Sequence, residues 1–318
     1  MSEMVLAWGA VLIGFVGLIW SADRFVAGSA SIATNFGVSK LLIGLTIVAF
    51  GTSAPEIVVS IISALKGAGD LAVGNALGSN LANIGLVLGV TALISPIPIK
   101  GHILKQEYPI MLGVSLVAGW FLWDATLQLW EGVVLLSLLI PVLAWMAFSK
   151  KQHPEEMDEE MPEYTFAKAA LWFLVGLVLL VASSNSLVWG AEVIALHFGV
   201  SPLIIGLTVV AIGTSLPELA ASVVSALKGH HDIAIGNVIG SNIFNLLVVM
   251  GIPPLIERLN MDTQVFSRDY MAMVILSAAL GAFMLMMYRF KKTQARMGRL
   301  LGLLLLCLYG IYYAILFQ

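Results

Sequence analysis

Two carboxylates within long hydrophobic runs are the residues of this sequence best placed to do chemistry. Glu56 ends the segment AFGTSAPE, and Glu218 ends the segment AIGTSLPE. Proline removes a backbone donor and glycine loosens a helix, so both segments should break a helix and leave carbonyl oxygens unbonded. Free carbonyls, two hydroxyls and a carboxylate form an all-oxygen set, which is the ligand type that hard cations prefer. The cation ligands predicted from these side chains are Thr52, Ser53, Glu56, Thr214, Ser215 and Glu218.

A second pair of polar segments follows one hydrophobic run later. The segment GNALGSNLAN ends at Asn83, and the segment GNVIGSNIFN ends at Asn245. Ser79 lies four residues before Asn83, and Ser241 lies four before Asn245, so each pair shares one face of a helix. Each pair offers a hydroxyl and an amide oxygen, and we predict that both pairs are cation ligands. The other asparagines, interpreted as supporting or helix-bonding groups, are Asn75, Asn80, Asn237 and Asn242.

The composition around these segments is that of a membrane protein. Of the 318 residues, 59% are hydrophobic and 11% are charged, and the mean hydropathy is +0.97. Soluble domains have roughly 25% charged residues, so this composition excludes an ordinary soluble enzyme and a disordered protein. The net charge of −3 excludes a nucleic-acid binder. No obligate protein partner is evident from the sequence. We expect the protein to lie in a lipid bilayer. Stretches long enough to span a bilayer lie near 4–22, 39–65, 70–93, 107–123, 127–148, 167–190, 201–227, 232–255, 270–288 and 300–317.

An internal repeat organises these ten stretches. Residues 38–89 align without gaps with residues 200–251, and 30 of the 52 pairs are identical. Each repeat holds five spans, and because five is odd, the second copy must enter the membrane in the opposite direction. Inverted repeats are typical of secondary transporters, whose substrate sites lie near the midplane on interrupted helices. We therefore predict an all-α polytopic membrane protein with ten transmembrane helices in two inverted-topology repeats, and with helices 2 and 7 broken at the midplane.

The charged residues predict how the chain is divided and oriented. The acidic, polar segment 150–164 separates a first five-helix repeat at 1–149 from a second, inverted repeat at 165–318. Thirteen of the sixteen Lys and Arg residues fall in the loops after odd-numbered spans, which places those loops in the cytoplasm. We expect a multi-pass protein of the cell inner (plasma) membrane, with both termini outside and a cytoplasmic linker at 150–164.

The segments GTSAPE and GTSLPE, each followed by GSN-x-x-N in the next span, resemble the two alpha-repeats of the calcium/cation antiporter superfamily. The resemblance covers essentially the whole chain and is closest to prokaryotic sodium/calcium exchangers. It implies a secondary antiporter that exchanges Na⁺ for Ca²⁺ by alternating access, with no cofactor beyond these transported ions and no enzymatic activity. It also implies that the first span of each repeat slides against the rest. The ion ligands it implies are Ala49, Thr52, Ser53, Glu56, Ser79, Asn83, Ala211, Thr214, Ser215, Glu218, Ser241 and Asn245.

Other activities stay open at the level of the sequence. On the same fold, protons could replace Na⁺, or another divalent cation could replace Ca²⁺; a channel and a membrane enzyme are the remaining alternatives. No predicted span holds a deep histidine or a His-Glu motif, which disfavours an enzyme. The proton-coupled branch of the superfamily typically has a GN-x-x-E segment, which is absent here. Several exchangers have Asp where this chain has Asn245, and the family links that Asp to potassium dependence, so potassium dependence is not expected.

Overall fold

The computed structural model describes residues 3–152, 164–199, 211–291 and 295–316, most of which are helical. The first repeat contains α1 (Glu3–Phe36), α2 (Lys40–Ile43), η1 (Gly44–Val48), α3 (Ala49–Thr52), α4 (Ala54–Leu65), α5 (Gly69–Ala82), η2 (Asn83–Leu88), α6 (Gly89–Ile94), β1 (Ile97–Pro98), η3 (Ile103–Glu107), α7 (Tyr108–Leu122), β2 (Thr126–Leu127) and α8 (Leu129–Gln152), where η denotes a π-helical turn. The second contains α9 (Phe166–His197), α11 (Ala211–Thr214), α12 (Leu216–Leu227), α13 (His231–Phe244), η5 (Asn245–Val249), α14 (Pro253–Ile256), β3 (Leu259–Asn260), η6 (Val265–Tyr270), α15 (Met271–Lys291), β4 (Arg296–Met297) and α16 (Arg299–Leu316).

Each of the ten predicted spans contains helix within these ranges, although the span at 201–227 begins before the described residues resume at Ala211. Seven of the described helices are long and apolar enough to cross a membrane, and the bent pair Lys40–Thr52 and Ala54–Leu65 makes an eighth. The chain is therefore an all-helical, multi-pass membrane protein. The predicted acidic linker at 150–164 lies almost entirely outside the described residues.

Matching hydrogen bonds relate the two repeats. The hydroxyl of Tyr108 in α7 donates to the carbonyl of Ser277 in α15, at 2.7 Å. The hydroxyl of Tyr270, the last residue of η6 directly before α15, donates to the carbonyl of Ser115 in α7, at 3.0 Å. Both residue pairs are related by the 162-residue offset of the sequence repeat, so α7 and α15 are equivalent helices that contact each other across the repeat interface.

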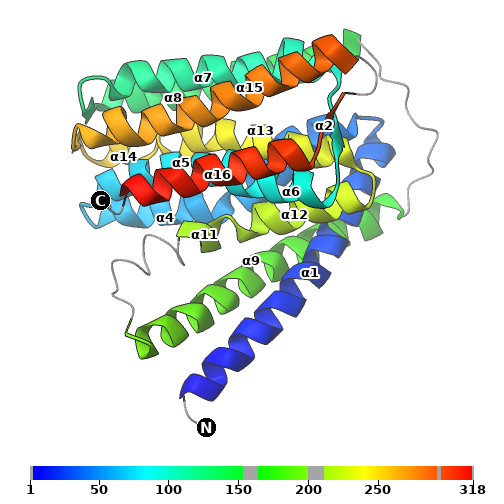
Figure 1. The fold of residues 1–318 in the computed structure, drawn as a ribbon, viewed down its shortest axis with the longest axis horizontal. Helices are drawn as coiled ribbons and strands as arrows, with labels where there is room; N and C mark the ends of the chain where they lie inside the picture. The colour runs from blue at the N-terminus through cyan, green and yellow to red at the C-terminus, as the bar shows by residue number, and fades with distance from the viewer. Residues whose placement is uncertain (1–2, 153–163, 200–210, 292–294, 317–318) are drawn as a thin grey trace.

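Helices α1 and α9 form a pair that stands apart from the other helices (Figure 1). Glycines let their backbones touch: a Cβ on Gly28 would lie 2.6 Å from the backbone nitrogen of Phe173. A Cβ on Gly176 would lie 2.6 Å from the backbone nitrogen of Phe25. Because small residues allow close helix packing in a membrane, these two helices pack as one unit.

The first span of each repeat is longer than predicted. Helix α1 has 34 residues and α9 has 32, whereas the predicted spans end at residues 22 and 190. The charges of Asp23 and Arg24 do not end α1, because both side chains find partners. Lys228 Nζ lies 2.7 Å from Asp23 Oδ1, and the Arg24 guanidinium lies 5.1 Å from the ring centre of Trp172 in α9.

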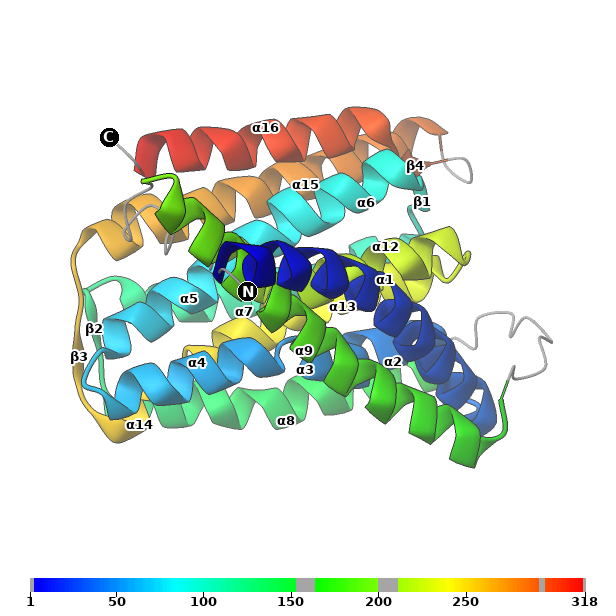
Figure 2. The same ribbon diagram turned by 90° about the horizontal axis from the view of Figure 1, so that it is seen from below.

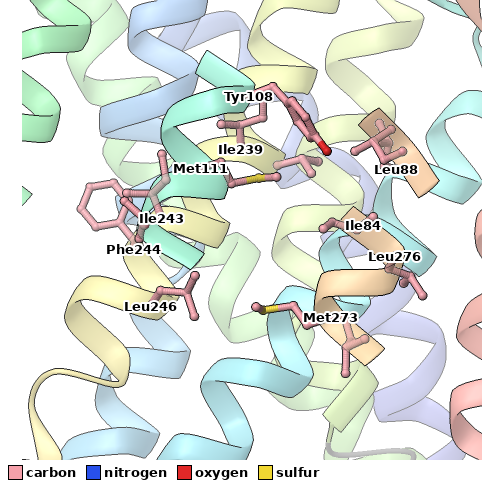
Figure 3. Packing of buried hydrophobic residues seen from close by; sticks show 14 of the residues in the cluster. Ile84, Leu88, Tyr108, Met111, Ile239, Ile243, Phe244, Leu246, Met273 and Leu276 are labelled. Atoms are coloured by element: carbon pink, nitrogen blue, oxygen red, sulfur yellow. The ribbon is translucent and has the colours of Figure 1, made fainter. Parts of the chain in front are cut away.

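The centre of the bundle is formed by two continuous helical stretches, α5 to α6 and α13 to α14 (Figure 2). Every residue of the most apolar part of the second stretch is buried. Figure 3 shows the hydrophobic packing around them, with side chains from α7, α13, α15 and η2. Two short antiparallel pairs, β1 with β4 and β2 with β3, connect loops of the two repeats. The polar segments of the predicted site thus lie inside this bundle, away from bulk solvent.

Candidate cation site

Both predicted helix breaks occur at a serine that lies two residues before the proline. Ser53 lies between α3 and α4 with φ −82° and ψ 5°, and the helices on its two sides are bent by 44°. Ser215 lies between α11 and α12 with nearly the same backbone, φ −87° and ψ 2°. A proline occupies the first turn of both following helices, where its missing N–H has no helical partner to lose. The same local chemistry therefore produces the same break in both repeats.

The two glutamates lie in the first turns of α4 and α12, and each is 1% exposed. Ser53 of the first repeat donates to Oε1 of Glu218 in the second, at 3.0 Å. Ser79 Oγ lies 3.4 Å from Oε1 of Glu56. Ser53 lies only three residues before Glu56, so this hydrogen bond brings the segment of one glutamate into contact with the carboxylate of the other. One site, built from both repeats, therefore holds both acidic groups.

Six oxygens of this site are buried and have no hydrogen-bond partner among the described residues. Buried polar atoms are nearly always bonded, because an unbonded one loses about 1–3 kcal/mol. These oxygens are Glu56 Oε2, Glu218 Oε2, Asn83 Oδ1, Asn245 Oδ1, Ser215 Oγ and Ser241 Oγ. All six belong to predicted ligands, and a dehydrated hard cation is a partner that would satisfy them. Within the described ranges no group of three or more His, Cys, Asp or Glu side chains is placed to hold a metal ion.

The remaining predicted ligands lie on the same helix ends. The hydroxyl of Thr52 donates to Asn237 Oδ1 at 3.0 Å, across the repeat interface. The carbonyl of Ala49 accepts a hydrogen bond from the Ser53 backbone N–H at 3.0 Å, and it lies 3.4 Å from the Thr52 hydroxyl. Ala211 begins α11 and Thr214 ends it, directly before the break at Ser215.

Supporting asparagines hold the ligands in place, in agreement with their interpretation from the sequence. Asn237 Nδ2 donates to the backbone carbonyl of Glu218 at 3.3 Å and to Ser222 Oγ at 2.9 Å. The equivalent Asn75 contacts the carbonyl of Glu56 at 3.4 Å. Asn80 Oδ1 accepts a hydrogen bond from Asn245 Nδ2 at 3.1 Å. The side-chain oxygen of Asn245, Oδ1, is left for another partner.

The sequence did not predict the π-helical turns at the site. The turn η2 begins at Asn83 and η5 begins at Asn245, the two equivalent asparagines that are predicted as ligands. In η5 the backbone N–H of Met250 donates to the carbonyl of Asn245 at 2.9 Å, a bond that spans five residues. Such turns occur frequently at functional sites. They have no characteristic composition, and within the two turns only Asn83 and Val87 are identical to their counterparts Asn245 and Val249.

The chain matches the family described as sodium/calcium exchanger protein over residues 6–148 and 168–318. It belongs to this family. Among the exchanger's relatives, CaxA of Alkalimonas amylolytica is 47% identical, over 99% of this chain and 100% of that protein. The inner membrane protein YrbG of Escherichia coli is 38% identical, over 99% of this chain and 98% of YrbG. A structure of the sodium-calcium exchanger NCX_Mj, soaked with Na⁺, is 34% identical with a TM-score of 0.84, over 98% of this chain and 99% of that one.

Membership of this family confirms the predicted class of protein. The exchanger is a membrane cation antiporter and not an enzyme, and its two matched regions correspond to the two repeats. The predicted fold class is also confirmed, because the likeness to NCX_Mj covers nearly the whole of both chains.

Proposed function

We propose that this protein exchanges Na⁺ for Ca²⁺ at a single site formed by the twelve predicted ligands. The observation that carries the proposal is the set of six unpaired buried oxygens, which includes one from each buried glutamate. Solved structures of the similar NCX_Mj were soaked with Na⁺ and with Ca²⁺ or Sr²⁺, which supports a site for these cations here.

The charge of the site explains why exchange is obligatory. Two ionised glutamates give the unloaded site a charge near −2, and one Ca²⁺ or two Na⁺ neutralise it. Moving an unpaired charge through the centre of a bilayer is costly, about 2.5–3.5 kcal/mol or more for each charge. The loaded forms therefore change conformation readily, whereas the unloaded form does not, and one ion crosses only in return for the other.

Alternating access follows from the separate helix pair. Helices α1 and α9 contact each other through glycines, and in the most apolar part of each helix only 22% and 17% of the residues are buried. We propose that the pair slides as one unit past the broken helices and exposes the site to one side at a time. The side closed in this structure is the one where α13 touches α2 and η1. A Cβ on Gly236 would lie 2.8 Å from the carbonyl oxygen of Leu41, so no ion passes between these backbones.

The repeats give the orientation of the proposed cycle. We place residues 1–149 and 165–318 as two oppositely inserted halves in the inner membrane, with both termini outside and the 150–164 linker in the cytoplasm. Under this orientation the closed contact between α13 and η1 is on the cytoplasmic side.

Flux measurements in proteoliposomes test the proposal. Vesicles loaded with Na⁺ and diluted into Na⁺-free medium should accumulate ⁴⁵Ca²⁺, and vesicles loaded with choline should not. An imposed proton gradient without Na⁺ should drive no uptake, and removal of K⁺ should change nothing, since residue 245 is Asn. Uptake driven by protons alone would overturn Na⁺ coupling, and Ca²⁺ flux with no counter-ion would indicate a channel.

A further inference from the structure

A pocket outside the cation site lies where α15 ends against β1 and β4. Its volume is about 1030 Å³. Both repeats contribute to it: the first provides Pro98 to Gly101, and the second provides Leu285, Met286, Tyr288, Arg289 and Ala295. In Figure 2, β1 and β4 lie together at one end of the bundle, beside α12. None of the residues that line the pocket is a predicted cation ligand.

The wall of this pocket is built by a specific backbone arrangement. Strand β1 pairs with β4, and the backbone N–H of Ile99 donates to the carbonyl of Ala295 at 2.9 Å. A Cβ on Gly101 would lie 2.6 Å from the hydroxyl oxygen of Tyr288, so glycine at this position lets the tyrosine ring close one wall. The shape is thus set by main-chain bonds that join the two repeats.

The lining combines cations with apolar side chains. Arg289 is exposed and forms no ion pair with a carboxylate in the described part of the chain. Lys100 lines the same pocket, where its Nζ lies 2.7 Å from Asp232 Oδ2. Below them, Leu285 is 58% exposed and Met286 is 48% exposed. An occupant must therefore carry a negative group at one end and hydrocarbon at the other.

The pocket also lies at the depth where such molecules are found. The membrane-spanning helix that includes α15 ends at Lys291, so Arg289 is in its last turn and Leu285 is one turn deeper. Basic residues at the ends of spans mark the headgroup layer of a bilayer. A soluble anion could bind the charge of Arg289 here, but it would make no contact with the apolar side chains of the wall.

We propose that this pocket binds one anionic phospholipid. Its phosphate contacts Arg289 and the hydroxyl of Tyr288, and its acyl chains lie along Leu285 and Met286. The headgroup lies near Lys100. A lipid headgroup that carries no cation of its own is therefore favoured over phosphatidylcholine, whose choline group is positively charged. Because both repeats form the walls, the bound lipid connects them and should stabilise the folded protein.

Thermal unfolding of the detergent-purified exchanger, titrated with phosphatidylglycerol, tests this proposal. Phosphatidylglycerol should raise the melting temperature more than phosphatidylcholine does. Arg289→Gln should weaken the apparent affinity for phosphatidylglycerol about fivefold, the usual contribution of one basic residue near an anionic lipid. Arg289→Lys should retain most of it. The matched control is Arg299→Gln, an exposed arginine in the first turn of α16 that does not line the pocket.

The outcomes distinguish a bound lipid from general surface charge and from a soluble anion. Equal shifts with both lipids, or an unchanged phosphatidylglycerol affinity in Arg289→Gln, would overturn the proposal. If Arg289→Gln and Arg299→Gln lost the same amount of phosphatidylglycerol affinity, the binding would come from general surface charge, and the proposal would be overturned. Glycerol 3-phosphate serves as the soluble anion: the same shift at the same concentration would assign the pocket to soluble phosphates. None of these readouts depends on which cations are exchanged.

Discussion

At the scale of residues, hydrogen bonds between side chains join the two repeats at the candidate site: Ser53 donates to Glu218, and Thr52 donates to Asn237. Glu56 and Glu218 stand out because a carboxylate is costly in a membrane and both occur in the same context. The sequence could not show that Ser53 bonds to the glutamate of the other repeat, because this contact depends on how the repeats pack. Nor could it show that Asn237 has more partners than Asn75, since their local sequences are nearly identical.

Replacing either glutamate by glutamine should abolish exchange without unfolding the protein. Glutamine keeps the shape of the side chain and removes the charge that offsets the dehydration of Ca²⁺. We expect Na⁺-driven Ca²⁺ uptake to fall more than about 100-fold. This exceeds the loss of roughly 10- to 100-fold that is typical when a group that only orients a metal ligand is removed. The matched control is Glu131→Gln, because Glu131 is also buried but accepts from the backbone N–H of Gln128 at the start of α8. Exchange near the unmodified rate in Glu56→Gln or Glu218→Gln would make that carboxylate structural.

The unequal partners of two equivalent asparagines lead to a second prediction. Asn237→Ala removes bonds to the Glu218 carbonyl, Ser222 and Thr52, so Glu218 loses its orientation. Apparent Ca²⁺ affinity should fall about 10- to 100-fold. Asn75→Ala removes one contact of 3.4 Å and should have a smaller effect. Equal effects in Ca²⁺ titrations of uptake would mean that the asymmetry has no functional consequence.

At the scale of elements, hydropathy located the spans well and their ends less well. The predicted boundaries of α5 to α6 and α13 to α14 agree with the structure within two residues. The predicted end of α1 is too early, because the charges of Asp23 and Arg24 indicate a boundary although Lys228 and Trp172 accommodate them inside the structure. Hydropathy contains no information on such partners from distant parts of the chain.

The glycine contact between α1 and α9 predicts a defect in movement and not in binding. A methyl group on Gly28 would meet the backbone of α9, so Gly28→Ala should separate the two helices and destabilise the protein by about 1–3 kcal/mol. Turnover should fall while Ca²⁺ binding is kept, because no predicted ligand lies on α1. Gly9→Ala is the matched control, since a Cβ there has no atom within 4 Å. Identical turnover in the two variants would argue against a sliding pair.

At the scale of the whole molecule, the odd number of spans in each repeat is the most informative feature of the sequence. It predicts two oppositely oriented halves, and the matching bonds of Tyr108 and Tyr270 agree with that symmetry. The sequence did not predict that α1 and α9 form a pair at one side of the bundle, because this arrangement depends on how all the helices pack together.

Equivalent positions of the two repeats should be reached from opposite sides of the membrane. Lys66 and Lys228 both end a helix and are both exposed. On a background without Cys307, a membrane-impermeant maleimide should label Lys66→Cys in intact cells and Lys228→Cys only after the cells are opened. Labelling of both from one side would contradict the inverted topology, and the reversed pattern would place the termini in the cytoplasm.

The most direct test of a site shared by both repeats is the number of Ca²⁺ ions bound per chain, measured by equilibrium binding of ⁴⁵Ca²⁺ to the purified protein. If both repeats form one site, each chain should bind a single Ca²⁺, Na⁺ should displace it, and Glu56→Gln and Glu218→Gln should each lose it completely. Two Ca²⁺ ions per chain, with one kept in each variant, would show two independent sites and contradict the shared site.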